Sequence, residues 1–245
     1  KRVASGVDGV PLWVGRLGSP HWPLGDGPTT VDLFAGCGGL SLGFRSAGFK
    51  IVAAVEVDSA AAEAYRKNFP DVGLCGPGGA LSPQGDIQVV HAEELLATIA
   101  SSIGPLGLVI GGPPCQGFSY IGRRRASDPR NMLYRHFIRL IGELRPTAYL
   151  LENVPGIMNL EGGKVFADIV AALQKLGYSV ASVLVNAATY GVPQLRTRLF
   201  VVGARDGRTV QLADGPLSPQ EYVTVRAALA DLPADCLVLV ALSGG

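Results

Sequence analysis

The sequence is poor in charged residues and in long apolar runs. Charged side chains make up 17% of the 245 residues, and the formal net charge is +1. Nucleic-acid-binding proteins usually carry a clear basic excess, so any basic surface here must be local. No apolar run approaches the roughly 20 residues that cross a bilayer, and residues 1–28 contain no signal-peptide core. We therefore expect a cytosolic protein.

Cysteine and histidine are scarce and form no recognisable site pattern. The sequence has three histidines and four cysteines, Cys37, Cys75, Cys115 and Cys236. The cysteines show neither a CxxC pair nor a framework spacing, so we expect no metal site and no disulfide scaffold. No histidine lies in a partner motif, which disfavours a thiol hydrolase because such an enzyme needs a base.

The apolar pattern of the chain predicts an α/β fold. Hydrophobic residues make up 48% of the sequence, enough to bury a substantial core. From Thr29 onward, short apolar runs alternate with helical stretches, which is typical of βαβ units. We expect a mostly parallel sheet with helices on both faces.

The expected elements follow from periodicity and turn residues. We predict strands at 30–34, 51–56, 87–90, 108–110 and 148–151. Helices are predicted at 40–47, 59–68, 93–99, 131–144 and 165–176, with Ser59 near an N-cap. The Gly- and Pro-rich residues 71–84 indicate an exposed loop, and runs 179–185 and 198–202 can pair as an antiparallel end to the sheet.

The first motif, DLFAGCGG from Asp32 to Gly39, is a strand that enters a glycine turn. Glycines there let backbone approach a ligand at a helix N-terminus. A dinucleotide fingerprint needs a third glycine where Ser41 stands, which favours a nucleoside without a pyrophosphate. Glu56 follows Gly36 by 20 residues, a position from which an acid can bind ribose hydroxyls. The alternative is a glycine turn needed only for packing and a surface glutamate.

The second and third motifs carry a thiol and a carboxylate. GGPPCQGFS places Cys115 in a loop stiffened by prolines and flanked by glycines, although a lone cysteine is more often a small buried side chain. ENVPG leaves Glu152 at the end of an apolar strand, where it can share a proton with a heteroaromatic base or simply cap a turn.

Two arginine-containing segments complete the set. In QLRTR, strand periodicity predicts that Gln194, Arg196 and Arg198 share one side, as a polar fork or as a salt-bridged sheet edge. A basic cluster follows the cysteine loop and is either a phosphate-binding surface or a solvated face; its members are Arg123, Arg124, Arg125, Arg130, Arg135 and Arg139.

In this order and combination, the motifs strongly resemble the cytosine carbon-5 DNA methyltransferase family from about Thr30 to Arg205. The resemblance implies a Rossmann-like, S-adenosylmethionine-dependent methyltransferase fold and double-stranded DNA as substrate. It places the donor at Phe34, Ala35, Gly36, Cys37, Gly38, Gly39, Leu40, Glu56, Val57, Asp86, Ile87 and Pro113. It assigns the target nucleotide to Gln116, Phe118, Ser119, Asn153, Gln194, Arg123 and Arg124.

The chemistry implied by the resemblance uses Cys115 as a covalent nucleophile. Carbon 5 of cytosine reacts poorly, so a thiolate adds at carbon 6 while Glu152 engages ring nitrogen 3. Arg196 and Arg198 then support the catalytic loop and the target nucleotide. Because a stacked base cannot present carbon 6, the resemblance also implies base flipping, and S-adenosylhomocysteine is the expected product of the donor.

The C-terminal part departs from the family plan. A target-recognition region and two further motifs usually follow VTVRAALADLP, whereas here the sequence continues as ADCLVLVALSGG. We expect an N-terminal extension at 1–28, a catalytic domain at 29–226 and the start of a truncated or absent recognition region at 227–245. The chain is then a fragment, a degenerate member or a split subunit whose recognition comes from a second polypeptide.

Three other functions stay open at this point. The chain can be an idle relative that binds DNA or regulates, although Cys115, Glu152 and Arg196 are all retained. The same chemistry can act on RNA, since the reaction does not distinguish the polymer. An unrelated nucleotide-dependent enzyme, such as a reductase, is opposed by Ser41.

Overall fold

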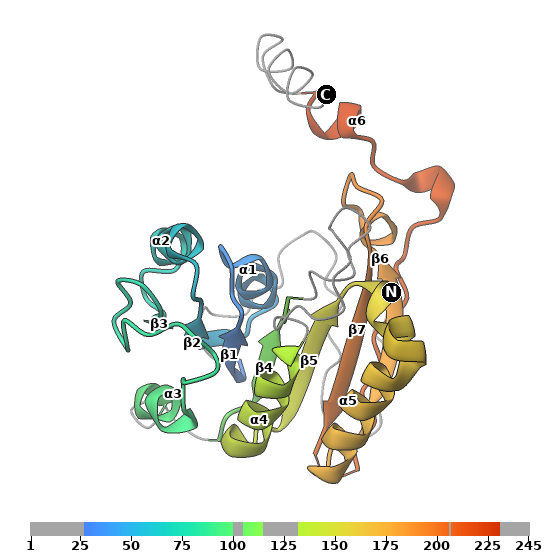
Figure 1. The fold of residues 1–245 in the computed structure, drawn as a ribbon. Helices are drawn as coiled ribbons and strands as arrows, with labels where there is room; N and C mark the ends of the chain where they lie inside the picture. Colours follow the sequence, from blue (N-terminus) through green and yellow to red (C-terminus); the bar gives the residue numbers. More distant parts are fainter. Residues whose placement is uncertain (1–26, 100–104, 115–131, 206, 231–245) are drawn as a thin grey trace. The chain divides into compact units, whose positions relative to one another are not determined.

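The computed structural model describes residues 27–99, 105–114, 132–205 and 207–230. A seven-stranded sheet runs through it in the order β3-β2-β1-β4-β5-β7-β6 (Figure 1). Its strands are β1 (Thr29–Leu33), β2 (Lys50–Val55), β3 (Gly73–Cys75), β4 (Leu108–Gly111), β5 (Ala148–Asn153), β6 (Ala181–Asn186) and β7 (Thr197–Ala204). The α-helices are α1 (Gly39–Ser46), α2 (Ser59–Asn68), α3 (Ala92–Ile99), α4 (Tyr134–Leu144), α5 (Lys164–Lys175) and α6 (Val225–Ala228). None of these helices is long and apolar enough to cross a membrane.

Five neighbouring strands of the sheet run in the same direction. β1 pairs in parallel with β2 and β4, β2 pairs with β3, and β4 pairs with β5. β7 then pairs antiparallel with β5, and β6 is its other neighbour in the sheet. Both predicted runs therefore lie at this end of the sheet. The carboxyl ends of the five parallel strands therefore meet at one edge of the sheet, where α/β proteins bind ligands.

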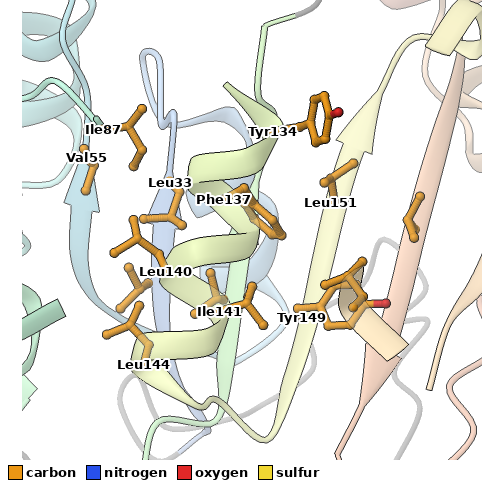
Figure 2. Packing of buried hydrophobic residues seen from close by; sticks show 14 of the residues in the cluster. Leu33, Val55, Ile87, Tyr134, Phe137, Leu140, Ile141, Leu144, Tyr149 and Leu151 are labelled. Atoms are coloured by element: carbon orange, nitrogen blue, oxygen red, sulfur yellow. The ribbon is translucent and has the colours of Figure 1, made fainter. Parts of the chain in front are cut away.

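Helices cover both faces of the sheet, as the sequence predicts. Figure 2 shows α4 against one face, with Phe137, Leu140 and Ile141 packed towards Leu33 and Leu151. The buried residues of α4 recur at helical spacing, and α3 and α5 contribute to the same cluster. The apolar residues of α1 and α2 lie in two other clusters, with strand residues that alternate with those facing α4. All five residues of β1 are buried, as expected for a strand covered on both sides.

One predicted strand is wrong. Residues 87–90 form a turn, in which the carbonyl of Asp86 accepts hydrogen bonds from Val89 N at 3.0 Å and Val90 N at 3.1 Å. The third parallel strand is β3, inside the segment predicted to be an exposed loop, and its Leu74 is 1% exposed. A short apolar run cannot by itself distinguish a strand from a buried turn, and pairing with β2 decides the matter.

Smaller differences concern the ends of elements. α2 begins as predicted, but its N-cap is Asp58, whose carboxylate accepts from Ala61 N at 2.9 Å. α4 begins at Tyr134, three residues after the predicted start. β5 continues through Glu152 and Asn153, which extends it by two residues because both pair with β7.

The chain divides into two compact units. The first holds the parallel strands, α1 to α5 and 199–213. The second consists of 184–198 and the residues from Asp214 onward. In the second unit, Ala187 N donates to Arg196 O at 2.9 Å, and Leu217 N donates to Thr189 O at 3.1 Å.

A buried polar chain links β1 to α1 and α2. The Ser41 hydroxyl donates to Asp32 Oδ2 at 2.7 Å and lies 2.8 Å from the hydroxyl of Tyr65. All three residues are fully buried, and among the described residues Asp32 Oδ1 has no hydrogen-bond partner. Burial raises the pKa of Asp32 from its ordinary value of 3.8 to about 7. Ser41, which stands where a dinucleotide fingerprint has a third glycine, thus links α1 to β1 across the glycine turn.

This raised pKa predicts a pH-dependent stability that Asp32→Asn removes. The folded protein binds the Asp32 proton more tightly than the unfolded chain, so its contribution is complete below pH 4 and is lost as pH rises through about 7. We expect the unfolding free energy of the wild type to fall relative to Asp32→Asn by on the order of 4 kcal/mol across that window. Urea denaturation at pH 4 to 8.5 measures the difference. A difference that stays constant with pH contradicts the assignment.

Candidate active site at the carboxyl ends of the strands

The turn after β1 has an unusual backbone. Phe34, Gly36 and Gly38 have φ values of 61°, 58° and 97°, so three of five residues lie in the left-handed region. A Cβ on Gly38 would collide with the ring of Phe69, whereas one on Gly36 would meet nothing within 4 Å. A non-glycine residue at such a φ is strained, and strain of this kind collects at functional sites. The turn therefore exposes backbone with room for a ligand beside Gly36.

The carboxylate of Glu56 joins this turn to the end of β2. Its Oε2 accepts from Gly36 N and its Oε1 accepts from Asp58 N, each at 2.7 Å. Two backbone donors hold the side chain in one orientation. A carboxylate has about four lone-pair sites, so Glu56 can accept further hydrogen bonds from ligand hydroxyls. Val57, which follows it, is 62% exposed and offers an apolar surface at the same strand end.

Glycines bring the next segment onto the same edge. A Cβ on either Gly76 or Gly85 would collide with the carbonyl oxygen of Glu56, so only glycine lets the backbone pass there. Asp86 follows immediately, and its Oδ1 accepts from Gln88 N at 3.0 Å. The N–H of Ile87 has no hydrogen-bond partner within the described part of the chain. This segment thus presents a carboxylate and a backbone donor beside Glu56.

The ends of β4 and β5 bring the second and third motifs together. A Cβ on Gly112 would lie 3.1 Å from Glu152 Oε2, so the carboxylate sits directly against the GGPP backbone. Asn153 is 4% exposed, and its Nδ2 donates to Pro113 O at 3.0 Å while its Oδ1 accepts from Val154 N at 2.8 Å. The strand that carries Glu152 therefore anchors the segment that leads into Cys115.

Comparison with known proteins assigns the family. The family model for C-5 cytosine-specific DNA methylases matches residues 29–238. The chain belongs to this family. The predicted resemblance is confirmed, and so is the predicted methyltransferase fold, since the same edge of the sheet carries the family's motifs.

Individual relatives support the assignment. The Type II methyltransferase M.AgeI of Thalassovita gelatinovora is 38% identical over 231 residues, which are 85% of this chain and 52% of that protein. M.AquIA of Picosynechococcus is 36% identical over 228 residues, 83% of this chain and 88% of that protein. A crystal structure assigned as a DNA modification methyltransferase encoded within a prophage (E. coli) matches with TM-score 0.68 and 36% identity, over 84% of this chain and 56% of that one. The chain spans about half the length of M.AgeI and of three other curated relatives that it matches, and most of the length of M.AquIA.

Several predicted methylase site residues lie outside the described residues. They are Cys115, Gln116, Phe118, Ser119, Arg123 and Arg124. Of the described cysteines, Cys37 is exposed in the glycine turn, whereas burial raises the pKa of the Cys75 thiol to about 11. Cys75 is thus a poor nucleophile, in keeping with a place in the core of the methylase fold.

The predicted strand alternation of the QLRTR motif is wrong for two of its three residues. Gln194 lies in a bend, where its N–H donates to Val192 O at 2.7 Å. Arg196 precedes β7, and its N–H donates to Asn186 Oδ1 at 3.3 Å, so only Arg198 is in the strand. Pro193, just before the motif, has no N–H for a ladder, and β7 begins only at Thr197. Gln194 and Arg196 are exposed in the second unit.

Arg139 differs from its predicted place in a basic surface. It is held against the carbonyls of Ile87 and Val90 and pairs with Glu143. The sequence analysis also missed the hydrogen bonds that join Asp32, Ser41 and Tyr65. The one sequence signal for them was Ser41 at the position of the third fingerprint glycine.

Removing the Asn153 amide is expected to loosen the anchor of the cysteine loop. In Asn153→Ala the buried carbonyl of Pro113 and the N–H of Val154 lose their partner, which costs about 1–3 kcal/mol of stability. Urea denaturation measures this, with Asn159→Ala as control because Asn159 is exposed. Equal effects of the two substitutions speak against an anchoring role.

Proposed function

We propose that this chain transfers a methyl group from S-adenosylmethionine to carbon 5 of a flipped cytosine in DNA. The observation that carries the proposal is that two groups lie at the same edge of the sheet in a chain of the C-5 cytosine methylase family. The glycine turn, bound by Glu56, follows β1, and the Glu152 carboxylate lies against Gly112 where β4 and β5 end. Because relatives are named Type II methyltransferases, we further infer a role in cytoplasmic restriction–modification.

The donor fits the groups at the ends of β1 to β3. Glu56, already oriented by two N–H groups, is suited to accept from ribose hydroxyls. Asp86 and the N–H of Ile87 suit the edge of an adenine, and Phe34 and Val57 offer apolar contact with its faces. The backbone from Ala35 through Leu40, which is open at Gly36 and Gly39 and covered by Phe69 at Gly38, suits the methionine end. Cys37 is exposed in the same turn, and Pro113 follows the neighbouring strand β4. When bound, the donor supplies a methyl group on a sulfonium centre.

Catalysis then rests on Cys115 and Glu152. The Cys115 thiolate forms a bond to carbon 6, and Glu152 hydrogen-bonds ring nitrogen 3, so electron density rises at carbon 5. After methylation there, loss of the carbon-5 proton restores the ring double bond and expels Cys115. The position of Glu152 against Gly112 supports this pairing, because Cys115 follows three residues later.

The remaining site residues are proposed from family membership. Arg196 and Arg198 would support the catalytic loop, and Gln116, Phe118, Ser119 and Gln194 would contact the flipped nucleotide. Arg123 and Arg124 would meet phosphate. Asn153 contributes by anchoring the loop through Pro113 O, because both ends of its amide are engaged.

We also propose that sequence recognition draws on polypeptide beyond these 245 residues. With net charge +1, the chain has little general affinity for a polyanion, and its longer relatives are about twice its matched length. The additional residues belong either to the same chain or to a second polypeptide. In this arrangement 29–226 is the catalytic domain, 1–28 is an extension and 227–245 begins the recognition region.

Glu56→Gln is expected to weaken donor binding. The amide turns an NH2 group towards one of the two N–H donors and removes the charge that favours ribose hydroxyls, so affinity should fall about 10- to 100-fold. Calorimetry with S-adenosylmethionine measures it, and Glu63→Gln, an exposed change on α2, is the control. If the wild type binds no donor, the donor assignment is wrong. If Glu56→Gln and Glu63→Gln bind the donor equally well, the proposed role of Glu56 is wrong.

In the presence of S-adenosylmethionine, DNA that contains 5-fluorocytosine should trap Cys115 covalently, because after methyl transfer to carbon 5 the fluorine cannot leave as the carbon-5 proton does. We expect a denaturant-resistant complex from the wild type and from Cys236→Ala, none from Cys115→Ala, and slower formation from Glu152→Gln. Adding the recognition polypeptide should accelerate trapping. Adducts that persist in Cys115→Ala refute the nucleophile, and adducts formed only with the matching RNA refute the DNA substrate.

A further inference from the structure

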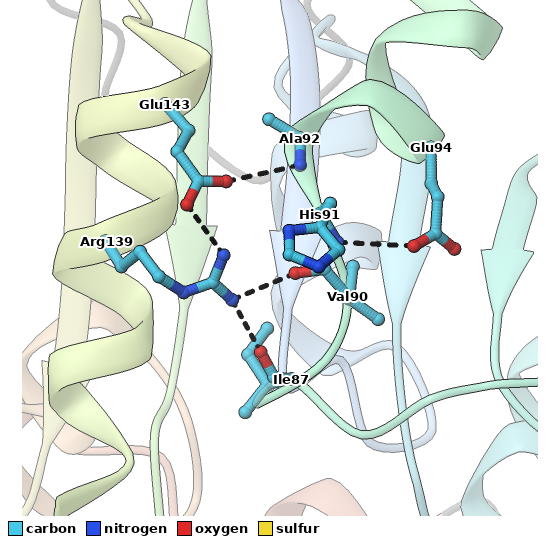
Figure 3. A network of polar contacts seen from close by, with 7 residues as sticks. All are labelled: Ile87, Val90, His91, Ala92, Glu94, Arg139 and Glu143. Atoms are coloured by element: carbon cyan, nitrogen blue, oxygen red, sulfur yellow. Dashed lines mark hydrogen bonds and ion pairs between the residues drawn. The ribbon is translucent and has the colours of Figure 1, made fainter.

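Arg139 on α4 binds the turn at residues 87–90, which the sequence predicted to be a strand. Arg139 Nη2 donates to the carbonyls of Ile87 and Val90 at 2.8 and 2.9 Å, and Nη1 donates to Glu143 Oε1 at 2.8 Å (Figure 3). Glu143 Oε2 accepts from Ala92 N, the first residue of α3, at 3.3 Å. The two side chains therefore bind the backbone from 87 to 92.

This turn depends on side chains because no sheet ladder reaches it. Ile87 and Val90 are buried, and among the described residues no donor other than Arg139 reaches their carbonyls. A guanidinium presents several N–H donors in one rigid plane, so it can bind two carbonyls and a carboxylate together. Buried carbonyls without partners cost free energy, so the turn geometry depends on the arginine.

The same helix lies within electrostatic reach of Asp86. His136 is one turn before Arg139 on α4, and its pKa is lowered first by burial and then by the charge of Arg139, while Asp86 opposes the shift. The carboxylate that begins the turn thus lies close to the helix that holds the rest of it.

We infer that Arg139, aided by Glu143, is a positioning residue for the donor: it sets the Asp86–Val90 turn, which would meet the adenine, without touching the ligand itself. This inference rests on the proposed function. It assigns to α4, the helix that follows residues 115–131, a part in the donor site. Arg139 accordingly does not belong to the basic surface in which the sequence had placed it.

The experiment compares Arg139→Gln, Arg139→Lys and a matched control in the full 245-residue chain. Arg135→Gln is the control, because Arg135 is exposed on the same helix and its loss changes the net charge equally. Calorimetry without DNA measures affinity for S-adenosylmethionine and S-adenosylhomocysteine. We expect about tenfold weaker binding for Arg139→Gln, an intermediate loss for Arg139→Lys, whose ammonium lacks the planar fork, and no change for the control.

A second measurement separates positioning from general stability. Hydrogen exchange of the amides from 87 to 92 should accelerate in Arg139→Gln, while exchange in β1 and β4 stays close to that of the wild type. Folded variants that lose only global stability and keep the donor affinity overturn the inference. Should Arg139→Gln fail to fold, Arg139→Lys still decides it, since unchanged affinity and exchange there also overturn it.

The two proposals fail in different ways. If the wild type binds neither donor nor product, the proposed function is wrong, whereas the exchange comparison still tests whether Arg139 holds the turn. If the wild type binds and Arg139→Gln binds equally well, the proposed function stands and the positioning role is wrong.

Discussion

The parallel direction of five neighbouring strands is the constraint on which the rest of this structure depends. Parallel strands need helical crossovers, so helices must cover both faces and the strand interiors must be apolar. The carboxyl ends of β1, β2, β3, β4 and β5 are consequently brought to one edge. Motifs separated by more than one hundred residues, such as the glycine turn after β1 and Glu152 on β5, reach the same edge of the sheet for this reason.

At that edge, side chains form hydrogen bonds with backbone groups that have no partner in the sheet. Glu56 accepts from Gly36 N across 20 residues of sequence, Asn153 donates to Pro113 O across 40, and Arg139 donates to Ile87 O across 52. Each bond satisfies a backbone group just beyond a strand or turn, where a ligand is expected to bind. Hydrogen bonds to charged groups are stronger than neutral ones, so Glu56 and Arg139 can fix turns that have little local structure.

The buried Asp32 side chain destabilises the fold close to the candidate site. A carboxyl group buried with one oxygen unpartnered is unfavourable, and its raised pKa reflects this. The same group orders Ser41 and Tyr65, and hence the start of α1 relative to β1 and α2. These hydrogen bonds fix the position of the glycine turn, which lies between β1 and α1, and so offset part of the unfavourable burial of Asp32.

The sequence alone determined the fold class, the family and most element positions, because periodicity, glycine turns and motif order are local properties that need no partner. It also indicated Glu56 and Glu152 through spacing and strand-end position. Only the tertiary structure decided that residues 87–90 form a turn, that 73–75 form the third strand, and that Gln194 and Arg196 precede β7. It likewise decided that Arg139 binds backbone carbonyls and Ser41 binds Asp32. These outcomes depend on partners 9 to 52 residues away, and such contacts are selected by packing and by the need to pair buried polar groups, which no local pattern encodes.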